Sequence, residues 1–173
     1  MHWFPAYVGL GSNLDGPAQR VQQALKALAV LDATQVIMVS PLYGSKPMGP
    51  VVQPDFCNAV AGLLTRLSVS DLFQALRALE QRLGRAPTRE RWGPRVIDLD
   101  LLAYAGEHVT SGELTVPHPG IVQRNFVLYP LADVAPELFI PGAGRVAVLA
   151  QTIGGDGLWR MDQQTMTSAS VYQ

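Results

Sequence analysis

Apolar and polar residues follow one another along the chain with two periods, one typical of strands and one typical of helices. Short apolar runs bounded by turn residues predict strands, whereas apolar residues that recur every three or four positions predict helices. The predicted strands are 6–11, 34–43, 56–65 and 96–104, and the predicted helices are 17–31 and 68–83. The third strand, FCNAVAGLLT, is largely apolar, so we expect both of its faces to be covered.

Residues at the ends of these segments support the boundaries. Pro17 suits the first position of a helix, where its missing N–H group would have no partner. Ser68 is followed three positions later by Asp71, which is the spacing of a capping box. The segment 9–13, GLGSN, indicates a strand that passes into a tight turn, and it is too short a glycine motif to predict a phosphate-binding loop.

The remaining segments complete a recognisable order of elements. They predict a long loop over 44–55, a hairpin over 107–116, a short helix within 124–135 and another near 145–153. The order β-α-β-β-α-β predicts an α+β fold of the ferredoxin-like split βαβ type, with an antiparallel sheet, helices packed on it and a short C-terminal extension. We expect one domain over residues 1–160 and a loosely ordered polar tail over 161–173.

Composition and charge change this picture mainly by exclusion. The 173 residues carry a net charge of −1, which excludes the broad basic field of a general nucleic-acid binder. No apolar run is long enough to span a membrane and the N-terminus does not resemble a signal peptide, so we expect a cytoplasmic protein. The single Cys57 excludes an intramolecular disulfide framework, and we expect it to be a small buried hydrophobe.

Two carboxylates interrupt the apolar fourth strand. Asp98 and Asp100 lie two positions apart, so alternation places both side chains on one face. Bare carboxylates in this arrangement repel each other, and a divalent cation would remove that cost. Mg²⁺ is favoured, since it binds one or two carboxylates together with water and substrate phosphates. The alternative is an edge strand whose polar face is merely solvated.

Basic residues gather directly upstream of this strand. Five of the 13 Lys and Arg residues fall within 14 positions, at Arg82, Arg85, Arg89, Arg91 and Arg95. Guanidinium groups bind phosphate oxygens, and phosphoryl transfer depends on positioning and charge neutralisation. A cationic cluster on a neutral protein therefore indicates a small phosphorylated ligand. Arg91 and Arg95 are the better candidates, whereas we expect Arg82 and Arg89 to be solvated.

A second cluster combines aromatic rings with an amide. Phe56 and Asn58 share a face of the third strand, and Trp92 and Phe126 lie further along the chain. Flat heteroaromatic ligands are held by stacked rings and by an amide at the ring edge. Taken alone, Phe56 and Phe126 are more typical of ordinary core residues, but a buried amide such as Asn58 needs hydrogen-bond partners. His118, between two prolines, is a candidate to face a ligand or to be structural.

Taken together, these segments resemble the 6-hydroxymethyl-7,8-dihydropterin pyrophosphokinases. The matching segments are GLGSNL (9–14), PDFCNA (54–59), RWGPRVIDLD (91–100), LTVPH (114–118) and RNFVL (124–128). They follow the order of the family from about residue 6 to residue 140, and the third of them is highly specific. The resemblance implies an enzyme that transfers diphosphate from Mg-ATP to the hydroxymethyl group of a reduced pterin in folate biosynthesis, with release of AMP.

The resemblance also implies how ATP is handled. Asp98 and Asp100 would hold two Mg²⁺ ions that bridge the phosphates, and Arg85 and Arg95 would assist catalysis. The residues implied in nucleotide binding are Arg77, Glu80, Arg91, Arg95, His118 and Arg124.

For the pterin, the resemblance implies a stacked ring whose edge is hydrogen-bonded. Asn58 would bind the ring edge, Phe56 and Phe126 would stack on its two faces, and Trp92 would belong to a loop that closes over the substrates. The full set implied in pterin binding is Ser45, Pro47, Met48, Phe56, Asn58, Trp92 and Phe126.

Three positions depart from the family pattern. Phe56 stands where Tyr is frequent, and Thr88 and Glu113 stand where relatives carry basic residues. The acidic pair is untouched, so we expect an active, monomeric enzyme with small-molecule substrates and with no nucleic-acid or membrane partner. The alternatives are a ferredoxin-like RNA-binding module, whose sheet aromatics would stack on bases, and another divalent-metal phosphotransferase.

Overall fold

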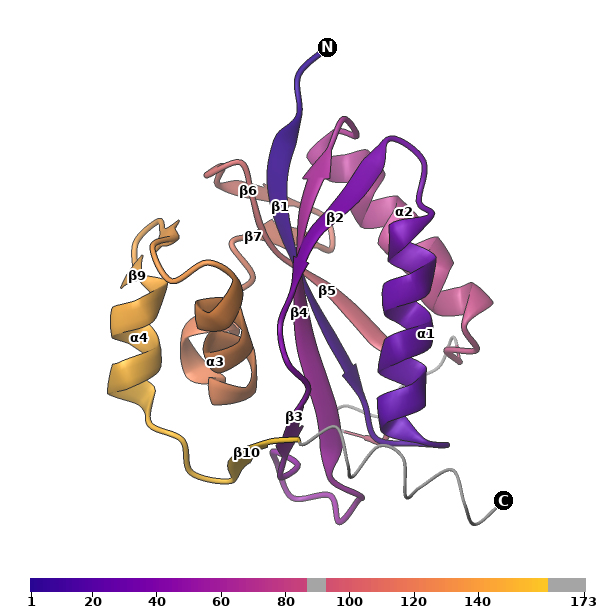
Figure 1. The fold of residues 1–173 in the computed structure, drawn as a ribbon, viewed down its shortest axis with the longest axis vertical. Coiled ribbons are helices and arrows are strands. Elements are labelled where there is room, and N and C mark those ends of the chain that lie inside the picture. The colour runs from indigo at the N-terminus through magenta and orange to yellow at the C-terminus, as the bar shows by residue number, and fades with distance from the viewer. Residues whose placement is uncertain (87–92, 162–173) are drawn as a thin grey trace.

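The computed structural model describes residues 1–86 and 93–161, and its order of elements agrees with the prediction (Figure 1). The first part of the chain forms β1 (Phe4–Ser12), α1 (Pro17–Ala29), β2 (Thr34–Val39), β3 (Tyr43–Ser45), β4 (Phe56–Thr65) and α2 (Val69–Arg82). The second part forms β5 (Asp98–Tyr104), β6 (Val109–Ser111), β7 (Leu114–Val116), the 3₁₀ helix η1 (Ile121–Gln123), α3 (Asn125–Val134), β8 (Phe139–Ile140), β9 (Gly144–Arg145), α4 (Val146–Ile153) and β10 (Leu158–Arg160).

An antiparallel sheet of six strands forms the centre of the molecule (Figure 1). Its strands lie in the order β10-β3-β4-β1-β5, and β2 pairs with the C-terminal half of β4, beside β3. If β2 and β3 are counted as one interrupted strand, β4 lies between this strand and β1, although α1 connects the two along the chain. This insertion is the split βαβ arrangement, and the predicted α+β fold is confirmed.

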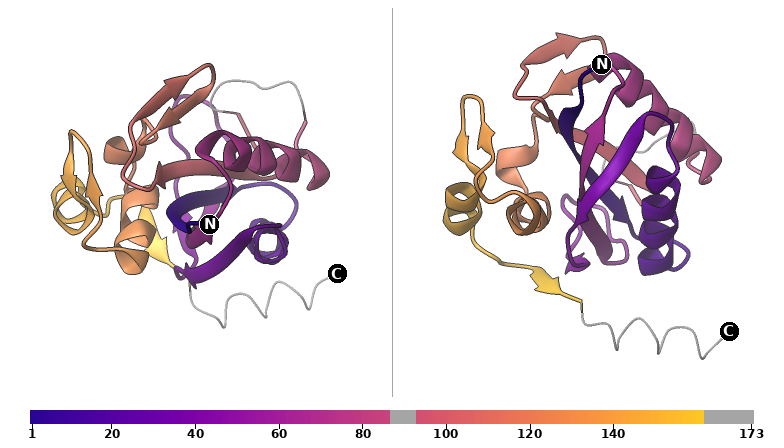
Figure 2. Two further views of the ribbon diagram at one scale, coloured as in Figure 1. Left: turned by 90° about the horizontal axis from the view of Figure 1, so that it is seen from above. Right: turned by 45° about the horizontal axis from the view of Figure 1, so that its top comes forward.

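Helices cover both faces of the sheet (Figures 1 and 2). Helices α1 and α2 bury their apolar faces against β1, β4 and β5 on one side, where Val21, Leu28, Leu72 and Leu76 lie in the core. On the other side a smaller core joins α3 and α4 to the sheet. Strand β4 contributes to both cores, which confirms that its two faces are covered.

Two features of the sheet differ from the prediction. The predicted strand 34–43 is broken into β2 and β3, because Pro41 has no N–H group to donate to a ladder. At the break, the Ser40 hydroxyl accepts a hydrogen bond from the Val60 amide at 2.9 Å, so a side-chain oxygen takes the place of a backbone carbonyl as the acceptor. Strand β10 and the β8–β9 hairpin were not predicted, because such short segments have no readable periodicity.

The predicted helix ends are largely confirmed. The Ser68 hydroxyl accepts from the Asp71 amide at 3.1 Å and donates to the Asp71 carboxylate at 2.7 Å, which caps α2. Gly84 follows the last turn of α2 with φ of +96°, a conformation that glycine adopts without strain. Helix α1 begins at Pro17 as predicted and ends at Ala29, two residues earlier than predicted.

The C-terminal extension returns to the sheet. Met161 donates its amide hydrogen to the Leu42 carbonyl at 2.9 Å, next to β10. The rest of the predicted tail lies outside the described residues. None of the helices in the described ranges is long and apolar enough to cross a membrane. The cytoplasmic location stays a prediction.

The environment of Cys57 predicts an unreactive thiol. Its side chain is buried in β4, and burial raises the pKa of the thiol to about 12. Since the thiolate is the reactive form, we expect an aromatic disulfide reagent at about pH 8 to leave the native protein unmodified and to modify one thiol in urea. Stoichiometric modification of the native protein, followed by absorbance, would contradict the buried position.

Candidate active site

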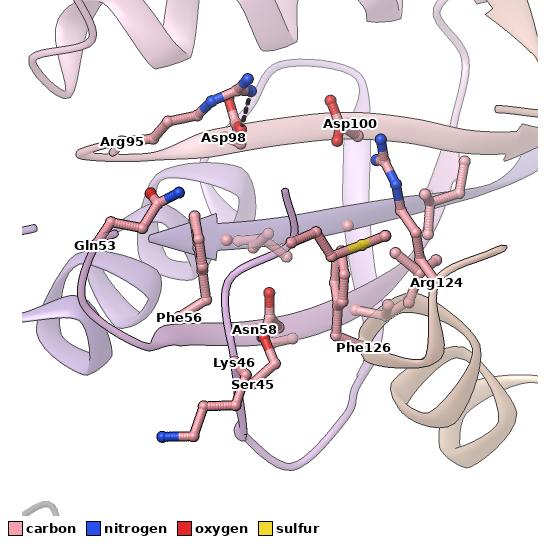
Figure 3. Close-up of a pocket in the computed structure, with 18 of the residues that line it drawn as sticks. Ser45, Lys46, Gln53, Phe56, Asn58, Arg95, Asp98, Asp100, Arg124 and Phe126 are labelled. Atoms are coloured by element: carbon pink, nitrogen blue, oxygen red, sulfur yellow. Dashed lines mark hydrogen bonds and ion pairs between the residues drawn. The ribbon is translucent and has the colours of Figure 1, made fainter. Parts of the chain in front are cut away.

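A cavity opens on the side of the sheet that carries α3 (Figure 3). Strands β1, β4 and β5 form its floor, and its walls come from the segment after β3 and from the start of α3. The residues of the sequence-based predictions that line it are Ser45, Met48, Phe56, Asn58, Arg95, Asp98, Asp100, Arg124 and Phe126. The fold therefore brings together both the aromatic and the acidic clusters that the sequence indicated.

Two glycines of β1 make the centre of this floor flat. Gly11 lies in register between Asn58 of β4 and Asp98 of β5, and Gly9 lies two residues earlier, opposite Asp100. Residues two positions apart on a strand share a face, so Gly9 and Gly11 both lie on the cavity face. Neither places a side chain between the Asn58 amide and the acidic pair. The sequence predicted a strand-to-turn passage for these glycines, but both lie within the strand and hold open the floor of the cavity.

Asn58 is a buried amide whose donor group is held by its neighbours. Its Nδ2 donates to the Ser45 hydroxyl at 2.8 Å and to the Tyr43 carbonyl at 3.4 Å. The amide oxygen is directed into the cavity, and the rings of Phe56 and Phe126 lie on either side of it (Figure 3). The arrangement is a slot for a flat ligand with an oriented amide at its edge.

Asp98 is held by two arginines. Arg85 Nη2 lies 2.7 Å from its Oδ1, and Arg95 Nη1 lies 2.5 Å from its Oδ2. The Asp98 side chain is 15% exposed and that of Asp100 is 29% exposed, so Asp100 is the more open of the two. Burial is the largest cause that raises the pKa of Asp98, and the charge of Asp100 is the second. The guanidinium groups of Arg95 and Arg85 oppose this shift.

Behind Asp98 lies a third carboxylate, Glu80 of α2. Its side chain is 1% exposed, and Oε1 accepts from the Leu99 amide of β5 at 2.7 Å. The same carboxylate forms ion pairs with Arg85 and, at 2.8 Å, with Arg77. Burial raises the pKa of Glu80, and the hydrogen bond from Leu99 and both arginines oppose that shift. Glu80 thus holds Arg85 against the acidic strand without lining the cavity.

His118 presents a donor to the acidic pair. Its Nδ1 accepts from the Gly120 amide at 3.0 Å, so the neutral ring carries its proton on Nε2. Nε2 lies 4.0 Å from Oδ2 of Asp100. Burial is the largest cause that lowers the pKa of His118, and it outweighs the opposing charge of Asp100. The lowered pKa favours the neutral imidazole, whose Nε2–H group lies on the side of Asp100.

Asn13 is a buried residue that joins two walls of the site and is not among the site residues predicted from the sequence. Its Oδ1 accepts from the Arg95 amide at 2.8 Å, and its Nδ2 donates to Gln53 Oε1 at 2.9 Å and to the Pro54 carbonyl at 3.0 Å. Gln53 also lines the cavity. The argument that drew attention to Asn58, namely that a buried amide needs partners, applies equally to Asn13.

The other predicted site residues lie outside the lining of this cavity. They are Pro47, Arg77, Glu80, Arg85 and His118, of which the last two contact the acidic pair. Arg91 and Trp92, like the departure at Thr88, lie outside the described residues. Glu113, in the turn between β6 and β7, is exposed.

The donor atoms of the site fit a hard divalent cation. Within residues 1–86 and 93–161, no group of three or more His, Cys, Asp or Glu side chains is arranged to hold a metal ion by itself. Two neighbouring carboxylates suit Mg²⁺, which completes its shell with water and substrate phosphates. A cation beside Asp98 and Asp100 would also remove the repulsion that raises the pKa of Asp98.

Comparison with known proteins agrees with this geometry. The model of the family described as 7,8-dihydro-6-hydroxymethylpterin-pyrophosphokinase matches residues 7–136. A 2-amino-4-hydroxy-6-hydroxymethyldihydropteridine pyrophosphokinase of Pseudomonas aeruginosa is 44% identical over 155 residues, which are 90% of this chain and 95% of that protein. The enzyme of the same name from Haemophilus influenzae is 41% identical over 146 residues, which are 84% of this chain and 91% of that protein.

Solved structures show the same fold at much lower identity. The wild-type HPPK-DHPS of Plasmodium falciparum superposes with a TM-score of 0.71 at 12% identity, over 92% of this chain and 44% of that chain. An HPPK-DHPS in complex with substrates superposes with a TM-score of 0.71 at 11% identity, over 92% of this chain and 47% of that chain.

These matches confirm the predicted enzyme class. A pyrophosphokinase of this family is an ATP-dependent diphosphotransferase that acts on hydroxymethyldihydropterin in folate synthesis. The chain belongs to the 7,8-dihydro-6-hydroxymethylpterin-pyrophosphokinase family.

Proposed function

We propose that the cavity binds both substrates, with the pterin in the aromatic slot and the phosphates of ATP over the acidic strand. The observation that carries this proposal is that the slot and the two carboxylates share one floor. Gly11 of β1 separates Asn58 from Asp98 without a side chain of its own (Figure 3). A group attached to the ring in the slot can therefore reach the phosphates.

The pterin would be recognised at its edge and on its faces. Ser45 and the Tyr43 carbonyl hold the Asn58 amide in one orientation, which leaves its oxygen to accept from the ring N–H groups. Phe56 and Phe126 would stack on the two faces, and Met48 would close the slot. Phe56 supplies the ring surface of a Tyr without its hydroxyl group. Pro47 and Trp92 would complete the enclosure.

ATP would be held by cations around the acidic pair. Asp98 and Asp100 would hold two Mg²⁺ ions, which when bound neutralise the phosphate charge. Arg95 and Arg124 line the cavity and would contact phosphate oxygens, as would Arg91. His118 would donate a hydrogen bond from its Nε2–H group to the nucleotide. Glu80 would act indirectly, by holding Arg85 in place, and Arg77 would act through its ion pair with Glu80.

The reaction needs alignment more than a tuned base. The hydroxymethyl oxygen attacks the β-phosphorus of ATP in line, and a new O–P bond forms. The bond from the β-phosphorus to the oxygen that bridges it to the α-phosphorus breaks, AMP leaves with that oxygen, and the hydroxyl proton passes to solvent. The chain contributes by fixing both reactants in one cavity and by placing Arg85, Arg95 and Arg124 around the developing charge.

We also propose that the chain works as a single domain and as a monomer, with ATP and the reduced pterin as its ligands. The support is that the described residues of a single chain form a cavity that contains both the aromatic slot and the acidic pair.

The activity is tested by separating the nucleotides after the protein is mixed with Mg-ATP, with and without hydroxymethyldihydropterin. We expect AMP only in the presence of the pterin, in equal amount to a pterin diphosphate. We also expect EDTA to abolish both products, because the carboxylates alone would repel the phosphates. ADP as the product would contradict diphosphate transfer, and AMP without pterin would contradict the acceptor.

Asp100 gives the cleaner test of the metal assignment, since Asp98 also holds two arginines. We expect Asp100→Asn to keep the fold and to lower the turnover number by about 100-fold or more, because an amide is a poor ligand for Mg²⁺. Asp32→Asn removes a carboxylate at an exposed position outside the cavity and should leave turnover unchanged. Comparable turnover of the two variants would contradict the assignment.

Glu80→Gln tests the support behind the acidic strand. The change leaves Arg85 buried with one carboxylate fewer, so we expect the free energy of unfolding to fall by about 3 kcal/mol and turnover to fall with it. The measurement is urea denaturation followed by circular dichroism. Arg82→Gln, at an exposed position on the same helix, is the matched control. Equal stability of both variants would mean that Glu80 is not needed to hold Arg85.

A further inference from the structure

The C-terminal strand β10 supports the segment that carries one wall of the cavity. β3 lies between β4 and β10, and Trp159 of β10 pairs with Gly44 of β3. The Lys46 amide extends this ladder by donating to the Gly157 carbonyl at 2.9 Å. Ser45, which orients the Asn58 amide, therefore lies in a three-residue strand that is held from both sides.

The indole of Trp159 covers Gly44 directly. A Cβ atom at Gly44 would lie 2.1 Å from Cε2 of Trp159 and 2.3 Å from its Nε1, closer than any real side-chain contact. The backbone of Gly44 does not require glycine, since its φ is not positive. The indole therefore leaves no room for a side chain at Gly44. Because side chains alternate along a strand, Gly44 and Trp159 lie on the reverse face from Ser45.

Lys46 connects this support to the other end of the loop between β3 and β4. Its ammonium group lies 5.5 Å from the centre of the Trp159 ring and 3.0 Å from Oδ2 of Asp55. Asp55 directly precedes Phe56, the first residue of β4. The indole, the ammonium and the carboxylate thus join the start and the end of the loop that contains Met48 and Gln53.

The turn before β10 is tied to the opposite wall. Nδ2 of Asn125 donates to the Gly154 carbonyl at 3.2 Å and to the Asp156 carbonyl at 2.9 Å. Asn125 is the first residue of α3, between Arg124 and Phe126 of the cavity lining. Residues 154–160 therefore bridge the two walls between which the flat ligand would stack, and Figure 1 shows this segment running from α4 beneath α3 to β3.

We infer that Trp159 is a positioning residue for the pterin: it holds β3 from the reverse face and so keeps Ser45 and the Asn58 amide in the orientation that binds the ring edge. The inference rests on the proposed pterin site. It assigns a role in substrate binding to a partly exposed residue, 41% accessible, that lies outside the cavity and outside the matched family segment. Nucleotide binding should not depend on it.

A double-mutant cycle between Trp159 and Gly44 tests this inference. We expect Trp159→Ala to raise the KM for hydroxymethyldihydropterin about tenfold and to leave the KM for ATP within about twofold. Gly44→Ala alone should raise the pterin KM to a similar degree, because the methyl group displaces the indole. In the Trp159→Ala background, where the indole is absent, Gly44→Ala should add little. Such non-additivity is the signature of direct contact.

Two controls separate the possible failures. Phe139→Ala removes an exposed aromatic side chain from β8 and should change neither KM. Asn58→Ala, in the same assay, tests the pterin site itself. An unchanged pterin KM in Asn58→Ala would overturn both the site and the inference. If Asn58→Ala raises the pterin KM, two results would overturn the role of Trp159 alone. One is an unchanged pterin KM in Trp159→Ala, and the other is additive effects of Trp159→Ala and Gly44→Ala. Trp159→Phe, which keeps a ring over Gly44, replaces Trp159→Ala if the latter unfolds, with a smaller rise expected.

Discussion

Burying two carboxylates side by side on one strand is the constraint on which the rest of the site depends. Desolvation and the neighbouring charge of Asp100 both oppose the ionised form of Asp98. Arg85 and Arg95 form ion pairs with Asp98, and the buried carboxylate of Glu80 in turn forms an ion pair with Arg85. Asp98, Arg85 and Glu80 each have a partner of opposite sign, so β5 can begin with an acidic face without unfolding the sheet around it.

The same arrangement divides the work between the two acidic residues. Asp98 is largely committed to its arginines, whereas Asp100 is more open and faces the neutral imidazole of His118. A bound cation would therefore compensate the charge of Asp100, whereas Arg85 and Arg95 already form ion pairs with Asp98. If the cation also bound Asp98, these two arginines would become available to phosphate oxygens. Under the proposed function, the groups that form the ion pairs around Asp98 would also bind the substrate phosphates.

Segments far apart in the chain converge on the cavity because polar side chains tie them together. Asn13 joins the loop before β4 to the segment before β5, and Asn125 joins α3 to the turn before β10. Both amides form hydrogen bonds with backbone groups that lie outside the strands of the sheet. One wall of the cavity is the loop after β3, and these contacts hold it in a defined position, which reduces the ordering cost when a flat ligand binds.

The sequence by itself determined the elements and the faces on which the chemistry lies. Alternation placed Asp98 and Asp100 together, and an amide in an apolar strand identified Asn58, because both signals are local and periodic. Only the tertiary structure decided which groups meet across the chain. The bond from Arg95 to Asn13 spans 82 positions, and the contact of Trp159 with Gly44 depends on the register of a three-residue strand. Neither leaves a periodic trace, since pairings of this kind are set by how the completed sheet and helices pack, and local pattern carries no information about them.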